Sequence, residues 1–279
     1  MPGTLFVVAT PIGNLEDITL RALRVLREAD VIAAEDTRRT ARLLARHVIP
    51  TPTVSFHEHN SRTRLPGLIA RLLKGESVAL VTDAGTPGIS DPGLELVQAC
   101  IESQVPIDPV PGVSAPLAAA VASGFPLVPL TIWGFVPHRS KDRNDWLRAR
   151  SETHTTMTFF ETPHRIAQTL KAAVDILGDR PIMLGRELTK VHQEFLRGTA
   201  AQLSDQVHTA VKGEFTVVVG PLTKQGPAEP PEDSVIAAEF GLMTKSNASL
   251  SRRQAVSATA SRLGLSPRDV YAAIERAKK

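Results

Sequence analysis

The sequence predicts an α/β protein with two α/β domains, followed by a linker and a small helical tail. Over the first 110 residues, short apolar segments alternate with amphipathic helical ones, which is typical of β-α-β units and a mostly parallel sheet. Farther along, some apolar segments follow one another without a helix, which indicates a mixed sheet. A proline-rich stretch then precedes a basic end. The expected parts are a first domain at 1–122, a second domain at 123–222, a linker at 223–234 and a tail at 235–279.

The composition is that of a soluble globular protein. Hydrophobic residues make up 42% of the 279 residues and charged residues 22%, which excludes disordered, collagen-like and membrane-bundle classes. Cys100 is the one cysteine, so a disulfide framework and a cysteine-based zinc site are excluded. The sequence shows no signal-peptide pattern and no apolar run long enough to span a bilayer. We therefore expect a cytoplasmic protein without a membrane partner.

The elements of the first domain follow from apolar periodicity and helix caps. Thr19 is a suitable N-cap for a helix that carries leucines on one side and arginines on another. An alanine-rich helix over 113–124 ends at Gly124. The expected strands are 4–9, 31–34, 53–56, 77–81 and 106–110, and the expected helices between the later strands are 37–46, 64–73 and 94–101.

The second domain and the tail show weaker but similar patterns. The expected strands are 131–135, 155–160, 182–185, 194–197 and 214–219, with helices at 165–176 and 201–207. In the tail, Ser251 begins a helix that stops at Gly264, and Ser266 caps another helix that has Pro267 at its first position. This pair fits either a helix-turn-helix or an ordinary packed hairpin.

Charge is distributed unevenly along the chain. The tail at 235–279 holds eight Lys and Arg residues and three acidic residues, a net charge of +5, whereas the remainder carries −2. A basic appendage on a mildly acidic body favours a polyanionic partner. An ordinary solvated helix face is the alternative interpretation.

Polar, glycine-rich segments follow the predicted strands of the first domain. Because ligands of parallel sheets bind outside the carboxyl ends of the strands, these segments predict a cleft at one sheet edge. The P-loop, the dinucleotide fingerprint and the nucleophile elbow are all absent from the sequence. The glycines after Asp83 let a nucleoside-type cofactor approach the backbone. His57 and His59 lack a third ligand, so we expect no metal. The polar, glycine-rich segments that follow the five predicted strands are TPIGN at 10–14, EDTR at 35–38, HEHN at 57–60, the loop at 82–93 and PGVSA at 111–115.

The chain resembles the tetrapyrrole methylase superfamily, and within it the branch of 16S rRNA cytidine 2′-O-methyltransferases. The segments that carry the resemblance are ATPIGNLEDIT, AAEDTR, SFHEHN, LVTDAGTPGISDPG, VPGVSA, FFETPHR, GRELTK and KGEFTVVVG, which together span about residues 4–220. The resemblance implies two α/β domains with a cofactor cleft between them. It also implies S-adenosylmethionine as the cofactor and, by analogy, a homodimer.

The resemblance also suggests roles for individual residues. The implied cofactor-binding residues are Asp83, Ala84, Gly85, Pro87, Gly88, Ser114, Ala115, Phe160, Gly213, Glu214 and Phe215. The resemblance also implies that Thr10, Pro11, Gly13 and Asn14 of the opening loop bind the substrate. Independently of the resemblance, Arg38 is a candidate phosphate contact, and the adjacent Arg252 and Arg253 of the basic tail are candidate RNA contacts.

The resemblance implies transfer of a methyl group to a cytidine ribose in the decoding region of 16S rRNA, within the small ribosomal subunit. A ribose hydroxyl is weakly acidic, so a base or a stabilising cation helps the transfer. The candidates are Glu35, Asp36, His57 and Lys190, and the sequence does not choose among them. A small-molecule tetrapyrrole methylase is the alternative enzyme, and a nucleic-acid-binding regulator is the alternative outside the enzymes. The basic tail argues against the first and the polar cleft against the second.

Overall fold

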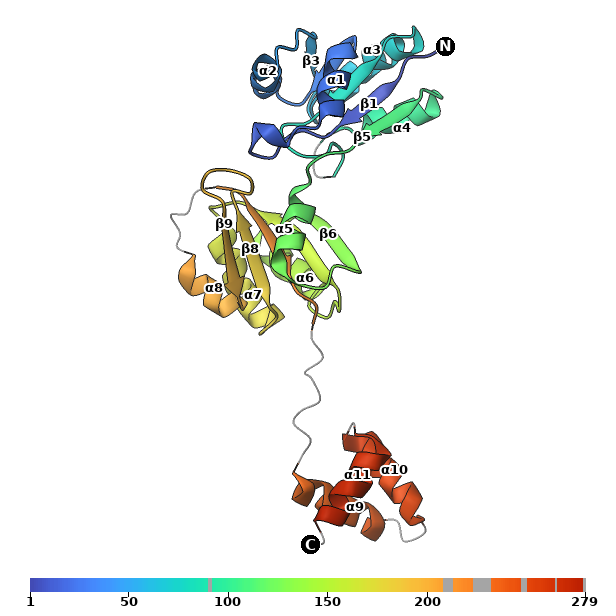
Figure 1. Cartoon of the computed structure of the whole chain (residues 1–279), viewed down its shortest axis with the longest axis vertical. Helices are drawn as coiled ribbons and strands as arrows, with labels where there is room; N and C mark the ends of the chain where they lie inside the picture. The colour runs from blue at the N-terminus through green and yellow to red at the C-terminus, as the bar shows by residue number, and fades with distance from the viewer. Residues whose placement is uncertain (90–91, 208–212, 223–231, 247–249, 264, 278–279) are drawn as a thin grey trace. The chain divides into compact units, whose positions relative to one another are not determined.

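A computed structural model describes residues 1–89, 92–207, 213–222, 232–246, 250–263 and 265–277. The chain forms two compact units, one over residues 1–222 and the other over residues 223–279 (Figure 1). Most of the predicted linker, at 223–231, lies outside the described residues, as does Gly264. Each unit is described separately below.

The first sheet is parallel throughout, as predicted. It has the strand order β3-β2-β4-β1-β5, and all neighbouring strands run in the same direction. Leu5 of β1 lies opposite Val78 of β4 on one side and Ile107 of β5 on the other. The strands are β1 (Leu5–Val8), β2 (Val31–Ala34), β3 (Thr53–Ser55), β4 (Val78–Val81) and β5 (Ile107–Val110).

Helices pack on both faces of this sheet because its strands are apolar on both faces. Ile32 and Ala34 of β2 pack with α1, whereas Val31 and Ala33 pack with α3 and α4. Buried Cys100 belongs to the second group, and burial raises the pKa of its thiol to about 11. The helices are α1 (Leu20–Glu28), α2 (Thr37–Arg46), α3 (Ser61–Leu73) and α4 (Leu94–Glu102), with a 3₁₀ turn, η1, at Leu15–Asp17.

Local hydrogen bonds set where the helices of this half begin. The Thr19 hydroxyl accepts from the Ala22 N–H, which confirms the predicted cap of α1. Helix α3 begins at Ser61, three residues before the prediction, because the chain already turns after β3. In that turn the Ser61 N–H donates to the His57 carbonyl, and Asn60 Oδ1 accepts from the His57 N–H. The turn fixes the HEHN segment at the end of β3.

The second sheet is mixed, again as predicted. Its order is β6-β7-β10-β8-β9; β6 and β7 are parallel, and the other neighbours are antiparallel. The strands are β6 (Leu130–Phe135), β7 (Thr156–Glu161), β8 (Ile182–Arg186), β9 (Glu194–Gly198) and β10 (Phe215–Val219).

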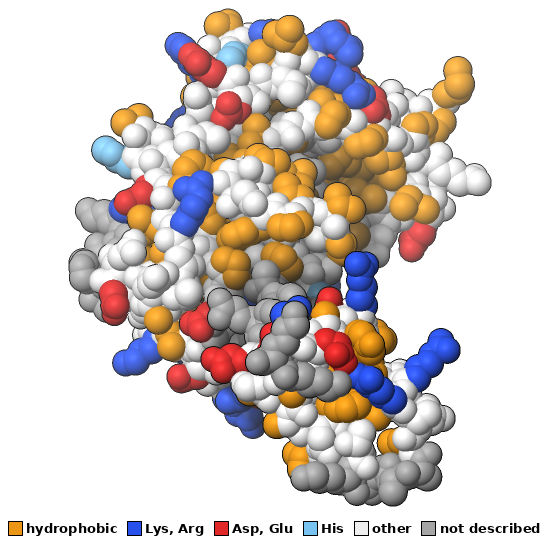
Figure 2. Space-filling model, turned by 60° about the horizontal axis from the view of Figure 1, so that its bottom comes forward, with side chains coloured by type: hydrophobic (Ala, Val, Ile, Leu, Met, Phe, Trp, Pro, Cys, Tyr) orange, Lys and Arg blue, Asp and Glu red, His pale blue; other side chains and the backbone are white. Residues whose placement is uncertain are grey.

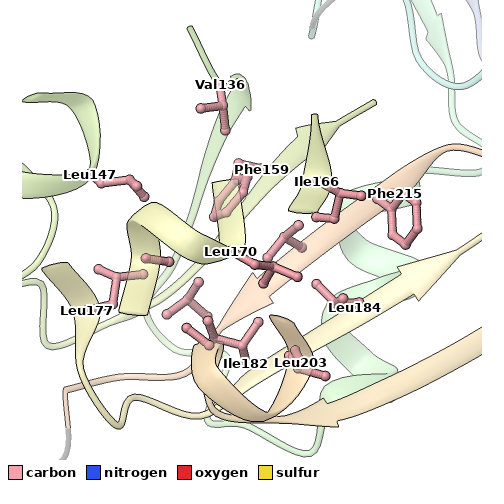
Figure 3. Close-up of a cluster of buried hydrophobic side chains, with 14 of the residues drawn as sticks. Val136, Leu147, Phe159, Ile166, Leu170, Leu177, Ile182, Leu184, Leu203 and Phe215 are labelled. Carbon is pink, nitrogen blue, oxygen red and sulfur yellow. The ribbon is translucent and has the colours of Figure 1, made fainter. Parts of the chain in front are cut away.

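Four helices cover the two faces of the second sheet. Helix α5 (Ala115–Ser123), which the sequence assigns to the first domain, packs here through Ala119 against Met183 and Val218. The opposite face holds a larger apolar cluster that includes Leu147, Phe159 and Leu170 (Figure 3). That face is covered by α6 (Ser140–Arg148), α7 (Ile166–Leu177) and α8 (Ala200–Gln206). Helix α6 has no counterpart among the predicted elements.

The second unit is a three-helix cluster with its own core. The helices are α9 (Asp233–Ser246), α10 (Arg252–Leu263) and α11 (Pro267–Arg276). The helical tail is thus confirmed, and α9 is an addition to it. Within the described part of the chain, no helix is long and apolar enough to cross a bilayer. The buried apolar side chains are Ile236, Val256, Ala260, Val270, Ala273 and Ile274.

The separate cores predict that the first unit folds alone. A chain cut after Leu222 keeps every described residue of the clusters around both sheets. We expect calorimetry to give a melting temperature within a few degrees of the full chain's transition for this unit. A fall of more than about 10 °C would mean that the tail packs on the first unit and stabilises it.

Candidate active site

The carboxyl ends of β2 and β4 exchange hydrogen bonds. The Asp83 N–H donates to Glu35 Oε2 over 3.1 Å, and Asp83 Oδ1 accepts from the Asp36 N–H over 3.0 Å. Arg39 Nη1 lies 3.2 Å from Asp83 Oδ2. We call this arrangement of Glu35, Asp36, Arg39 and Asp83 the strand-end clasp. It fixes two predicted site residues, Glu35 and Asp83, side by side.

A cavity of about 360 Å³ opens on one side of the clasp. Its apolar walls include Ile12, Phe135 and Phe160, and the centroids of the two phenylalanine rings are 5.2 Å apart. We call it the apolar cavity. It is lined by Ile12, Glu35, Arg39, Asp83–Thr86, Ile89, Ser114–Pro116, Phe135, Phe160–Pro163 and Glu214–Thr216.

A glycine backbone forms part of the apolar cavity. Gly85 exchanges two 2.9 Å backbone hydrogen bonds with Thr10, so the opening loop and the loop after β4 pair at this point. Its φ of 80° lies in the left-handed region, which side chains with a Cβ rarely adopt. Glycine is therefore needed here to bring the backbone to the cavity wall.

A larger cavity of about 770 Å³ lies on the other side of the clasp. Because Glu35 and Asp83 line both cavities, the two spaces share a wall. We call this second space the carboxylate cavity, since five of its lining side chains are acidic. It is lined by Glu35–Arg38, Ser55, His57–His59, Asp83 and Pro92–Glu95.

Arg38 holds Asp36 in its ionised form. The pKa of Asp36 lies well below its usual value because its oxygens accept hydrogen bonds from the Arg38 guanidinium and from the Arg38 N–H. An aspartate held this way is a weak proton acceptor. Its second role, as N-cap of α2, follows from the same backbone contact.

Lys190 lies apart from these two cavities. It lines a third cavity of about 560 Å³ together with Gly13 and Asn14 of the opening loop. Burial lowers the pKa of Lys190, but its contacts with Glu187, at 2.8 Å, and Glu214, at 3.4 Å, outweigh this effect and the net shift is upward. Lys190 is thus a cation at neutral pH.

The structure brings most of the predicted residues to these cavities. Asp83, Ala84, Gly85, Ser114, Ala115, Phe160, Glu214 and Phe215 line the apolar cavity, whereas Pro87, Gly88 and Gly213 do not. Asp36, Arg38 and His57 line the carboxylate cavity, and Glu35 lines both. Thr10 contributes through its pairing with Gly85. Arg252 and Arg253 are in the second unit.

Other lining residues escaped the sequence reasoning. Phe135 ends β6 and Thr216 follows Phe215 in β10, so their positions at strand ends were the available signal. Ile12 lies within the opening loop, where only its neighbours Thr10, Pro11, Gly13 and Asn14 were predicted to bind a ligand. Among the described residues, no group of three or more His, Cys, Asp or Glu side chains is arranged to hold a metal ion.

The parallel sheet, the mixed sheet and a ligand cavity at the strand ends define a two-domain α/β enzyme of the methylase type. Residues 4–204 match the family of tetrapyrrole (corrin/porphyrin) methylases, and the chain belongs to this family. It is therefore a methyltransferase, and S-adenosylmethionine is its methyl donor.

Curated relatives are similar over much of the chain. A protein of Halalkalibacterium halodurans named ribosomal RNA small subunit methyltransferase I is 49% identical over 221 residues, which cover 78% of this chain and 75% of the relative. A protein of the same name from Synechocystis is 40% identical over 271 residues, which cover 96% of both chains.

Solved structures share the fold at low sequence identity. Uroporphyrin-III C-methyltransferase from Thermus thermophilus, complexed with S-adenosyl homocysteine, has a TM-score of 0.56 and 20% identity, with 77% of this chain and 97% of that chain covered. A diphthine synthase has a TM-score of 0.62 and 16% identity, with coverage of 78% and 90%. These similarities confirm the predicted fold.

The apolar cavity fits S-adenosylmethionine. Its volume lies in the range of about 300–1,000 Å³ that is usual for small-molecule sites. Ile12 and Phe160 offer apolar surface for a flat heterocycle, and the Gly85 backbone permits close approach. Glu35 and Glu214 supply negative charge to balance a sulfonium and an ammonium group. The residues present therefore fit the heterocycle, the sulfonium and the ammonium group of the cofactor.

Replacing Gly85 with valine is expected to weaken cofactor binding by more than tenfold, because a β-branched residue is strained at this φ and adds bulk at the cavity wall. Isothermal calorimetry with S-adenosylmethionine measures the loss. Gly124→Val is the matched control: its φ of 78° imposes the same strain, but it lies outside the apolar cavity. Equal affinities in the two folded variants would contradict the assignment.

Proposed function

We propose that this methyltransferase modifies the 2′-hydroxyl of a cytidine ribose in the decoding region of 16S rRNA, in the small ribosomal subunit. The observation that supports the proposal is the carboxylate cavity, which shares Glu35 and Asp83 with the apolar cavity and is therefore a space for an acceptor next to the proposed cofactor site. The names of the relatives in Halalkalibacterium and Synechocystis support rRNA as the substrate. This proposal also assigns the protein to the cytoplasm.

Positioning supplies much of the catalysis in such a transfer. The residues that line the apolar cavity would hold S-adenosylmethionine, which would supply a methyl group to the ribose oxygen with its sulfur as the leaving group. The clasp holds the wall between the two cavities rigid, because each carboxylate in it accepts a backbone N–H. Under this proposal, a fixed wall between the two cavities helps to position the acceptor oxygen for the transfer.

The hydroxyl proton must leave as the new bond forms. Glu35 is the candidate base best placed, because it alone among the four candidates borders both cavities. His57 lies in the acceptor space, and its Nδ1 is buried without a hydrogen-bond partner in the described structure. Asp36 is engaged with Arg38, and Lys190 is held as a cation by Glu187 and Glu214. We therefore propose Glu35 or His57 as the base and Asp36 and Lys190 as positioning residues.

A labelled-methyl transfer assay tests the proposed substrate. Small ribosomal subunits from a strain that lacks this modification, naked 16S rRNA and a tetrapyrrole are offered in parallel. We expect label in RNA at one nucleotide, resistant to alkaline cleavage because its 2′-oxygen is methylated. Label in the tetrapyrrole alone would overturn the proposal in favour of the small-molecule alternative.

We also propose a homodimer, with α5 and β6 at its interface. The exposed fractions of Leu117, Val121 and Val128 are 52%, 72% and 94%, high values for apolar side chains. Ile132 of β6 is also partly exposed, and Figure 2 shows apolar side chains gathered over the middle of the first unit. Sedimentation of the full chain distinguishes one copy from two.

The second unit is proposed to contact RNA. Three of its described arginines already pair with acids: Arg252 with Glu275, Arg262 with Glu239 and Arg276 with Asp233. In the described part of this unit, Arg253 and Arg268 are exposed and have no ion pair, so their charges are available for phosphates. Of the pair predicted from the sequence, Arg253 is thus the stronger candidate.

Double replacement Arg253→Gln and Arg268→Gln is expected to reduce the salt dependence of RNA binding. Each lost phosphate contact lowers the log–log slope by roughly 0.7–0.9, so the pair lowers it by about 1.5. Filter binding over a range of potassium chloride concentrations measures the slope. The paired arginines provide the control, Arg262→Gln with Arg276→Gln, which is expected to change the slope less. If the slope of the first variant is unchanged, these arginines do not bind RNA.

A further inference from the structure

We infer that Glu58 and Glu95 read the base of the acceptor nucleotide, accepting hydrogen bonds from the exocyclic amino group of cytosine and thereby excluding uracil. This inference rests on the proposed function, and it identifies the residues that determine base specificity within the acceptor space.

The carboxylate cavity has room for a base beyond the ribose. Its volume of about 770 Å³ is about twice the 360 Å³ of the apolar cavity, the proposed cofactor site. The wall shared with the apolar cavity is the place for the reacting ribose. The remaining walls of the cavity are formed by the turn after β3, at 57–59, and by the start of α4, at 92–95, and the base would contact these walls.

The hydrogen bonds and ion pairs within the protein determine which carboxylates of the carboxylate cavity are free to bind a base. Glu35 accepts the Asp83 N–H, Asp36 binds Arg38, and Asp83 binds Arg39 and the Asp36 N–H. Glu58 and Glu95 are the two carboxylates of the cavity wall whose side chains have no hydrogen bond or ion pair within the described structure. Both are exposed to solvent, so a ligand can reach them.

The same cavity also presents hydrogen-bond donors. Helix α4 begins at Leu94 after Gly93, and no side chain in the described structure caps this end. The N–H groups of the first helical turn have no acceptor within the helix, and here they border the cavity. Acceptors and donors are therefore available in one space.

Cytosine matches this combination better than uracil. Its amino group donates, which suits a carboxylate, and its ring nitrogen and carbonyl oxygen accept, which suits backbone N–H groups. Uracil places a carbonyl oxygen where cytosine has its amino group, so a carboxylate repels it.

The test compares cytidine with uridine at the methylated position. The wild-type enzyme first identifies that position; small subunits are then reconstituted with either nucleotide there, and single-turnover rates are measured. Glutamine both donates and accepts, so the double variant Glu58→Gln with Glu95→Gln is expected to lower the cytidine-to-uridine rate ratio on the order of tenfold or more. Calorimetry with S-adenosylmethionine confirms that each variant is folded and binds the cofactor.

The matched control is Glu102→Gln, the same change at the far end of α4 and away from the cavity, for which we expect an unchanged rate ratio. The single variants Glu58→Gln and Glu95→Gln repeat the measurement should the double variant fail to fold. An unchanged ratio, or an equal loss of rate on both nucleotides, would overturn the base-reading role. A wild-type enzyme that methylates no RNA would instead refute the proposed function.

Discussion

The reciprocal hydrogen bonds between Glu35, Asp36 and Asp83 are the interaction on which the site depends. They join the ends of β2 and β4, which are neighbours in the parallel sheet, just where the ladder of that sheet stops. Hydrogen bonds to charged groups contribute about 1.5–3 kcal/mol each, so two of them hold the loops after both strands. Because Glu35 and Asp83 line both cavities, the clasp also fixes the wall that the two cavities share.

The sequence predicts the sheets well because burial leaves a strong pattern. Strand β2 is apolar at all four positions, since both of its faces are covered, and such a run has few other interpretations. Helix α6 was missed because its sequence, SKDRNDWLR, is almost wholly polar and buries only Leu147 and Arg143. Helix α9 was missed for a related reason. Its buried residue Ile236 packs against residues of α10 and α11, so the sequence of α9 alone does not show which of its faces is buried.

The candidate site could be predicted where topology alone determines position. Glu35, His57 and Asp83 follow three adjacent strands of one parallel sheet, so their meeting at one edge follows from the strand order. Phe135 and Thr216 reach the apolar cavity only through the packing of the second sheet, which no pattern within the first domain encodes. Lys190 is set apart by its turn, where Thr189, at a φ of 64°, accepts the Asn14 N–H through its hydroxyl.

The distribution of charge separates attraction of the substrate from its recognition. An acidic acceptor space favours the amino group of a base but repels the phosphates that flank it, so it contributes selectivity at a cost in affinity. Attraction for a polyanion must then come from cations outside this space. Arg253 and Arg268 of the second unit are free for that role, whereas Arg38 and Arg39 are engaged with the carboxylates of the clasp. The unit at 1–222 has a net charge of 0 and the unit at 223–279 a net charge of +3, so the excess positive charge of the chain lies in the helical unit.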